Sequence, residues 1–366
     1  MRMNLDTGNT AEHSERYRAE DLIQFCEALY VARGMQRDMA ARSARILVEA
    51  DLLGHSTHGM ALLPGYLKAL ADGTLRACGE PIIENQRTVA QVWHGQRLSG
   101  LWLTERAIET ATTMARAHGT GTISIKHSHH IACLAAYLEA PARAGFMVIV
   151  QSSDPCTASV APHGGITPIM TPNPIAVGIP TGSDPIMIDI SSSITANGPS
   201  QRMMREGRRA PGLWFVDSEG RGSNDPAVAF TDPPLPRGAL LPLGGLDAGH
   251  KGFGLGLMIE SMTGGLAGFG RADPPEGWGA SVFVQVLDPE AFGGLASLTR
   301  QTDHLREISH ASKPQPGVGR VRLPGEGGLA RKAEQRATGV HLHPSILPAL
   351  APIAREVGVS MPALIT

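Results

Sequence analysis

Apolar residues recur at helical spacing near the start of the chain. Residues 19–35 and 36–54 each carry apolar side chains three and four positions apart, and Gly34 is placed to end the first of these helices. A third helical pattern covers residues 62–73. The N-terminal region is therefore predicted to be a helical unit.

Beyond this unit the pattern changes to strands that alternate with helices. Residues 81–95 have the β-branched content of strands around a turn. The elements expected next are a helix at 104–119, a strand at 121–127, a helix at 133–145 and a strand at 146–153. This alternation predicts helices layered over a sheet.

The second half of the chain combines irregular and regular stretches. Residues 154–242 are rich in Pro, Gly and Ser, which is typical of binding loops or lids. A helix at 250–266 and a last strand at 281–287 follow. Helices at 297–309 and 344–358 are expected to pack back on the N-terminal helices. The predicted division is a helical domain at residues 1–78, an α/β cofactor-binding domain at 79–299 and C-terminal helices at 300–366.

Composition narrows the range of partners. The formal net charge of the 366 residues is −2, so no excess of one sign would attract nucleic acid or an anionic membrane. The polar start after Met1 predicts no signal peptide. Glu260 interrupts the most apolar run, so no membrane-spanning segment is predicted. The four cysteines are scattered, which favours reduced thiols and a cytoplasmic location. A small-molecule substrate is therefore expected.

Histidines supply the candidate chemistry. His127, His129 and His130 stand within four positions, and they are compatible with a metal site, with proton transfer or with a structural role. No recognised set of metal ligands completes the cluster, so no metal is expected. Two more polar segments are found at 54–60, with two histidines, and at 249–252, where a helix start would suit an anion.

The usual nucleotide-binding signatures do not match. Gly252, Gly254 and Gly256 form the first half of a dinucleotide fingerprint, but Leu257 occupies the position of the third glycine. No phosphate-binding loop of the G-x-x-x-x-G-K-[ST] type is present. Spacing rules alone therefore indicate an α/β enzyme with histidine acid/base chemistry.

Several motifs together resemble the malate/L-lactate dehydrogenase family, which also contains sulfolactate, ureidoglycolate and cyclic-imine reductases. They are "GHSTHGMALLPGY", "HSHHIACLAAY", "PNPIAVGIP", "MIDISSS", "GGLDAGHKGFGLGLMIE", "LDPEAFGG" and "VRLPGE", in this order. The resemblance implies a homodimer that binds NAD or NADP on a non-Rossmann sheet flanked by helices. It also implies hydride transfer between the nicotinamide and a small 2-hydroxy or 2-oxo acid, or a related imine.

The resemblance assigns the proton-transfer groups. The family's Ser-His-Gly motif matches Thr57, His58 and Gly59, and His130 matches its second reactive histidine, beside the nicotinamide. A carbonyl that receives hydride needs a nearby acid, for which histidine is suited. Both histidines are retained as catalytic, with His130 slightly favoured and His58 as its partner. His127 and His129 are interpreted as local variation.

The same match implies the cofactor contacts. They are His130, Ile131, Ala132, Cys133 and Leu134 along the cofactor; Asp189, Ile190 and Ser191 at the adenosine ribose; Gly244, Gly245, His250 and Lys251 at a phosphate; and Pro324, Gly325 and Glu326 in a C-terminal loop. An aspartate that accepts from ribose hydroxyls disfavours a 2′-phosphate, so NAD is preferred over NADP.

Three departures from the family concern the substrate. Leu62 replaces an arginine suited to clamping a carboxylate, and Arg202 is the expected substitute. Asn197 starts a segment where relatives carry a charged residue. The family's Gly-Thr-Asn-Pro motif is also changed in this sequence. Thr171 and Asn173, in the segment that replaces it, are the expected substrate contacts.

Two other functions stay open at this point. One is a metal-dependent hydrolase or lyase that uses His127, His129 or His130 as ligands. The other is a nucleotide-binding relative without catalysis, suggested by the loss of the arginine at Leu62.

Overall fold

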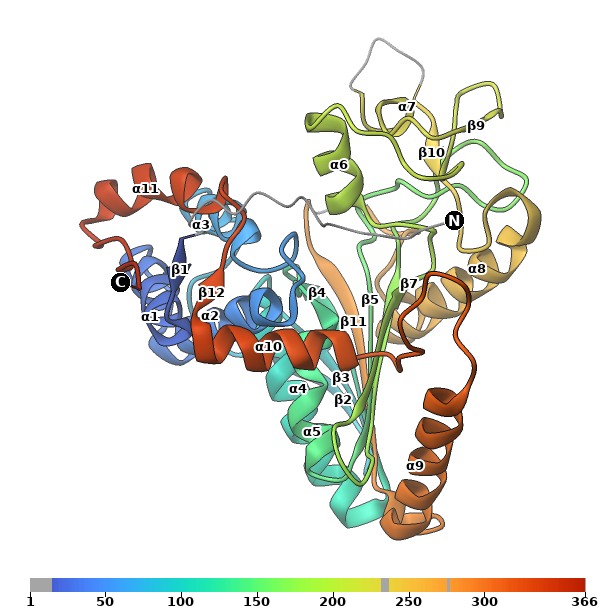
Figure 1. The fold of residues 1–366 in the computed structure, drawn as a ribbon. Coiled ribbons are helices and arrows are strands. Elements are labelled where there is room, and N and C mark those ends of the chain that lie inside the picture. Colours follow the sequence, from blue (N-terminus) through green and yellow to red (C-terminus); the bar gives the residue numbers. More distant parts are fainter. Residues whose placement is uncertain (1–14, 232–236, 275–276, 366) are drawn as a thin grey trace.

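The computed structural model describes residues 15–231, 237–274 and 277–365, and Figure 1 shows their arrangement. Within these residues a seven-stranded sheet stands between a helical region, formed by both ends of the chain, and a smaller region of loops and short strands. The polar start of the chain, at 1–14, lies outside the described residues. None of the described helices is both long and apolar enough to cross a membrane.

The main sheet is mostly antiparallel, with one parallel pair, β3 and β4. In order across the sheet, its strands are β2 (Ile82–Gln86), β3 (Ala90–His94), β4 (Thr120–Ser128), β11 (Ala280–Leu287), β5 (Met147–Ser153), β6 (Pro174–Ile179) and β7 (Ile186–Ser191). The strand expected at 281–287 is therefore central, and the two-residue strand β12 (Val340–His341) still follows it in sequence.

The two faces of the sheet differ in polarity. Val282, Val284 and other apolar side chains of β4 and β11 pack with α4 (Gly100–His118) in the main core. On the opposite face, the hydroxyls of Ser153 and Thr263 share a hydrogen bond. Thr263 belongs to the π-helical turn η3 (Ser261–Gly265), which continues α8 (Gly245–Glu260). Figure 1 shows α4 and α8 on opposite sides of the sheet. The period-2 alternation of β11 thus places its valines in the main core and gives the other face a mixture of polar and apolar side chains.

The helical region joins distant segments of the sequence. It contains α1 (Ala19–Ala32), α2 (Arg37–Leu53), η1 (Met60–Leu62), α3 (Leu63–Ala71), α10 (Glu326–Thr338), α11 (Ile346–Val357) and the two-stranded pair of β1 (Arg16–Tyr17) with β12. Helix α10 packs on α2, and α11 packs on α1 and α3. The expected packing of residues 344–358 on the N-terminal helices is found for α11, whereas α10 was not among the predicted helices.

Helix α9 (Leu295–Ala311) lies elsewhere than expected. We expected residues 297–309 to pack on the N-terminal helices, but Thr302 donates to Pro180 O and the Asp303 carboxylate accepts from Gly182 N in the β6–β7 connection. Figure 1 shows α9 on the side of the sheet away from the helical region. The amphipathic pattern identified the helix but not the surface that it covers.

Two further expectations differ from the structure. The helix expected at 133–145 is divided into η2 (Leu134–Tyr137) and α5 (Glu139–Arg143), because Pro141 lacks the N–H that would bond Tyr137 in a continuous helix. The region 154–242 is less irregular than expected, since β6 and β7 form an antiparallel pair in it.

The smaller region completes the fold. It contains a three-stranded sheet and two helices: β8 (Phe215–Val216), β9 (Gly222–Ser223), β10 (Ala239–Leu240), α6 (Asn197–Arg205) and α7 (Ala227–Phe230). A separate apolar cluster around Phe215 and Leu240 holds it together. One more short turn, η4 (Pro289–Ala291), precedes α9.

Candidate active site

A cleft of about 530 Å³ opens where the loop after α2 meets the ends of several strands. Its described lining residues are His55, Thr57, His58 and Leu62, then 130–134, 152–154, Thr157, 171–174, 189–191, 196–199, Gln201, Trp278 and Gly279. The cleft therefore contains His58 and His130, the two histidines to which the family resemblance assigns catalysis.

His58 lies in the loop that follows α2. Gly54 ends that helix with a left-handed backbone (φ 92°), and the chain then turns towards the cleft. The hydroxyl of Thr57 lies 2.9 Å from Nδ1 of His58, so one side of the ring is engaged. The Asp51 carboxylate accepts a 2.7 Å hydrogen bond from Met60 N, which closes the same loop.

His130 follows β4 and is held by an aromatic group. The hydroxyl of Tyr66 on α3 lies 2.7 Å from Nδ1 of His130. The indole of Trp278 lies 4.9 Å from the imidazole, centroid to centroid, and stacks on Tyr66 at 5.2 Å. In both histidines Nε2 is thus the nitrogen left for a ligand.

Both imidazoles are in surroundings that favour the neutral ring. Burial lowers the pKa of His58 to about 4, with the charge of Arg202 as a lesser cause. Burial also lowers the pKa of His130 to about 3. Desolvation disfavours the charged form of a base, so both rings are neutral at pH 7 in the protein without ligands.

Helix α6 approaches His58 closely. A Cβ on Gly198 would lie 3.3 Å from Cβ of Thr57, which is tighter than an ordinary contact, and 3.6 Å from Cε1 of His58, which is van der Waals contact. Because α6 begins at Asn197, its positive end is near the imidazole and also disfavours protonation. Asn197 lines the cleft, and its Oδ1 is buried without a partner among the described residues.

The residues expected at the cofactor fall into two groups. Within the cleft are His130, Ile131, Ala132, Cys133, Leu134, Asp189, Ile190 and Ser191. Asp189 accepts a 2.8 Å hydrogen bond from Ala135 N, which joins β7 to the start of η2. Ala132 adopts a left-handed backbone (φ 57°), as does Asn173 (φ 41°), which also lines the cleft. Such conformations are costly for residues other than glycine and are common at functional sites.

The second group lies outside the described lining of this cleft. Gly244, Gly245, His250 and Lys251 belong to the start of α8, where Leu243 N donates to Ser192 O next to the end of β7. Pro324 and Glu326 border a second cavity of about 610 Å³, and Pro324 O accepts from Met187 N at the other end of β7. Gly325 lies between them, against Met187. Strand β7 thus runs between the two cavities.

The residues expected at the substrate are also divided. Leu62, Thr171 and Asn173 line the cleft. Thr171 donates to Asn173 Oδ1, and Asn173 donates to Glu260 Oε1. Arg202 is not among the lining residues, and its guanidinium donates to the hydroxyl and the carbonyl of Ser56. No lysine or arginine is found among the described residues that line the cleft.

The other histidines of the cluster point elsewhere. The His127 ring packs between His94, at 4.3 Å, and Phe269, at 3.9 Å. His129 is buried edge-on against Tyr66 and Trp278. Among the described residues, no group of metal-ligating atoms brings them together with His130. The structure does not support a metal-dependent hydrolase built on these three histidines.

Sequence reasoning missed several residues of the site. Tyr66 belongs to the quoted motif "GHSTHGMALLPGY", and its spacing from His58 could have drawn attention to it. Trp278 and Asp51 carried no such signal, since their importance comes from neighbours that are distant in sequence. The cleft also includes the end of β5, where Asp154 accepts hydrogen bonds from Cys156 N and the Thr157 hydroxyl.

Comparison with known proteins identifies sequence relatives along nearly the whole chain. Residues 17–351 match the family described as malate/L-lactate dehydrogenase. The chain is 34% identical over 322 residues to (2R)-3-sulfolactate dehydrogenase (NADP(+)) of Chromohalobacter salexigens, covering 85% of this chain and 89% of that one. It is 30% identical over 334 residues to Delta(1)-pyrroline-2-carboxylate/Delta(1)-piperideine-2-carboxylate reductase of Pseudomonas syringae pv. tomato, covering 87% and 90%.

A solved structure agrees with the fold. The malate dehydrogenase of Entamoeba histolytica superposes with a TM-score of 0.90 at 22% sequence identity, covering 96% of this chain and all of that one. The expected α/β fold, a non-Rossmann sheet flanked by helices, is confirmed at this level.

Proposed function

The chain belongs to the malate/L-lactate dehydrogenase family, and on this premise we propose that it transfers hydride between a nicotinamide cofactor and a small 2-hydroxy or 2-oxo acid, or a related cyclic imine. One observation carries the proposal. His58 and His130 come from separate segments to one cleft, and each has Nδ1 engaged by a hydroxyl. This arrangement is suited to moving a proton beside a carbon that gains or loses hydride.

The cleft has the volume and the polar groups of a ligand site. A volume of about 530 Å³ is within the usual range of ligand pockets. In the proposal, residues 130–134 line the cofactor and Asp189 accepts from its ribose hydroxyls. The start of α8 and the loop at 324–326 are two further contacts, at opposite ends of β7. When bound, the cofactor supplies the hydride-transfer chemistry.

We favour NAD as the cofactor. A 2′-phosphate beside Asp189 would place negative charge against a carboxylate, and the described lining residues include no lysine or arginine to compensate. The relative from Chromohalobacter salexigens carries NADP(+) in its name, and comparison of NADH with NADPH tests the preference of this chain.

The two histidines divide the proton transfer. His130 exchanges the proton with the oxygen or nitrogen of the reacting group, and His58 assists it. Ala132 N donates to Nδ1 of His130, so the neutral ring carries its proton on Nε2, from which it can be donated to the reacting group. In the direction of reduction, the negative charge of a bound carboxylate raises the pKa of a neighbouring imidazole and allows it to act as the acid.

The substrate is small and has a carboxylate that is not clamped by arginine. Leu62 contributes apolar surface, and Thr171 and Asn173 present a wall fixed by their bonds to each other and to Glu260. Arg202 then acts indirectly, because its bonds to Ser56 hold the loop that carries Thr57 and His58. A homodimer in the cytoplasm is the expected working form, and sedimentation of the purified protein tests the dimer.

Binding of NADH and NADPH to the purified chain tests the proposal. The shift in nicotinamide fluorescence and the rise in melting temperature are measured for each nucleotide. NADH is expected to bind more tightly than NADPH, and Asp189→Asn should weaken NADH more than Asp72→Asn, an exposed control. A screen of 2-oxo acids and cyclic imines follows. Failure of both nucleotides to bind would overturn the dehydrogenase proposal, and binding without turnover would favour a non-catalytic relative.

A further inference from the structure

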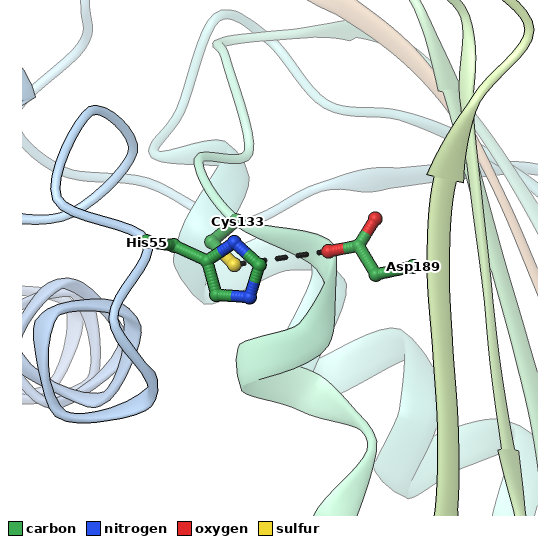
Figure 2. Close-up of side chains that lie close together, drawn as sticks. All are labelled: His55, Cys133 and Asp189. Carbon is green, nitrogen blue, oxygen red and sulfur yellow. Dashed lines mark hydrogen bonds between the residues drawn. The ribbon is translucent and has the colours of Figure 1, made fainter. Parts of the chain in front are cut away.

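Three side chains with different metal-ligating atoms meet beside the cleft. Figure 2 shows His55, from the loop after α2, converging with Cys133, which precedes η2, and with Asp189 on β7. A ring nitrogen, the Sγ atom and a carboxylate oxygen all lie within 4.8 Å of one another. Among the described residues, no other group of three or more such side chains comes this close together. We call these three side chains the His55–Cys133–Asp189 cluster.

The distances suit tetrahedral coordination. Metal bonds of about 2.3 Å to sulfur and about 2.1 Å to oxygen, at the tetrahedral angle, separate the two ligand atoms by roughly 3.6 Å. Sγ of Cys133 and Oδ2 of Asp189 are 3.8 Å apart in the structure. Two of the three ligands are therefore already placed at coordination spacing, and a ring nitrogen of His55 lies within 4.8 Å of both.

The surroundings of the cluster favour a bound cation. The thiol of Cys133, which is 3% exposed, and the Asp189 carboxyl are two acids that lie side by side. A divalent ion would provide the positive charge that two buried acids lack, and a coordinating thiol is then deprotonated.

The cluster also has support from its neighbours and an open side. Ala135 N donates a 2.8 Å hydrogen bond to Oδ2 of Asp189, which orients the carboxylate as the second shell of a metal site does. The His55 ring makes no hydrogen bond to a described residue. All three residues line the cleft, so a fourth position is accessible to water.

We propose that the His55–Cys133–Asp189 cluster binds a divalent transition metal ion, of which zinc fits the donor set best. A mixed nitrogen, sulfur and oxygen set at tetrahedral spacing is typical of zinc rather than magnesium or calcium. The site has three protein ligands and one open position.

Metal binding has a consequence for the enzyme, and this consequence rests on the proposed function. Asp189 is the residue that we expect to accept from the cofactor ribose, and Cys133 lies along the same cofactor path. An ion bound to Asp189 and Cys133 would take the place of the cofactor at these residues, so metal and dinucleotide exclude each other. Zinc is then a competitive inhibitor with respect to the nucleotide.

The test uses Co²⁺ as a spectroscopic replacement for zinc, in the purified full chain without nucleotide. We expect stoichiometric binding, visible bands of four-coordinate cobalt and a thiolate-to-cobalt charge-transfer band in the near ultraviolet. Cys133→Ser should abolish the charge-transfer band, and His55→Gln should weaken binding by more than about tenfold. Cys78→Ser, which removes an exposed thiol, is the matched control and should leave the spectrum unchanged.

The outcomes separate the two proposals. Absence of the charge-transfer band, or its loss in Cys78→Ser instead of Cys133→Ser, would overturn the metal site whatever the nucleotide does. If cobalt binds as expected and NADH also binds, the apparent Kd for NADH should rise in proportion to zinc concentration in the unaltered chain but not in Cys133→Ser. Simultaneous binding of both would disprove the exclusion.

Discussion

The hydroxyl of Tyr66 lies 2.7 Å from Nδ1 of His130, although one residue belongs to the helical region and the other follows a strand of the sheet. The phenol ring also stacks on Trp278, with 8° between the ring planes. Tyr66 thus fixes the imidazole at the boundary between the helical region and the sheet.

Tyr66→Phe is expected to lower kcat by about tenfold, which corresponds to ~1.4 kcal/mol, a usual contribution for one hydrogen bond. The ring and its stacking remain, so the fold should be retained. Steady-state kinetics across pH is the measurement, because loss of the partner of Nδ1 should also displace the pH profile of kcat. Tyr17→Phe, whose hydroxyl bonds Glu15 far from the cleft, is the control. An unchanged pH profile would mean that Tyr66 contributes packing alone.

His130→Gln is expected to lower kcat by about 10²–10⁴-fold, the usual contribution of a general acid or base. Nucleotide affinity should stay within several-fold of the original. His58→Gln should have a smaller effect on kcat, because His58 is proposed to assist. Single-turnover measurement of NADH oxidation at saturating substrate reads the chemical step directly. A larger loss in His58→Gln than in His130→Gln would reverse the two roles.

Leu62→Arg is expected to raise kcat/KM for simple 2-oxo acids such as pyruvate. Leu62 lines the cleft without a charge, and a guanidinium there would provide the bidentate carboxylate contact that is missing. A gain of about tenfold would match one charged hydrogen-bonded contact. Leu62→Met, which is similar in size and uncharged, is the control. No gain in a normally folded variant would mean that the carboxylate is bound at another wall.

Asp51→Asn is expected to make stability less dependent on pH. Burial raises the pKa of Asp51 to about 7, whereas an unfolded aspartate titrates near roughly 4. The folded state therefore holds a proton that the unfolded state has lost, and stability falls as pH rises from about 4 through about 7, by up to ~1.4 kcal/mol per pH unit. Asparagine keeps an acceptor for Met60 N without this titration.

Urea unfolding at several pH values between 5 and 8 measures this effect. The unaltered chain should lose more stability over the range than Asp51→Asn. Asp72→Asn, at an exposed carboxylate, should behave like the unaltered chain. Equal pH slopes for all three proteins would show that Asp51 stays ionised in the fold.

Local patterns predicted much of the secondary structure. The helical spacing of residues 19–35 and 36–54 corresponds to α1 and α2, and the strands expected at 121–127 and 146–153 correspond to β4 and β5. These predictions succeed because each element buries one face, and burial of one face requires apolar residues at a characteristic spacing. The same signal failed for α9, whose apolar face was recognised but whose partner was not.

The sequence by itself determined the types of the main elements and, through its motifs, the family, and it supplied the proposed catalytic pair His58 and His130. Only the tertiary structure decided that Tyr66 and Trp278 enclose His130, and that His55, Cys133 and Asp189 meet. The physical reason is that the type of an element depends on interactions within one segment, whereas a site depends on contacts between segments. Periodicity reports the burial of neighbours along one element, whereas convergence depends on strand register and helix packing, which no local segment contains.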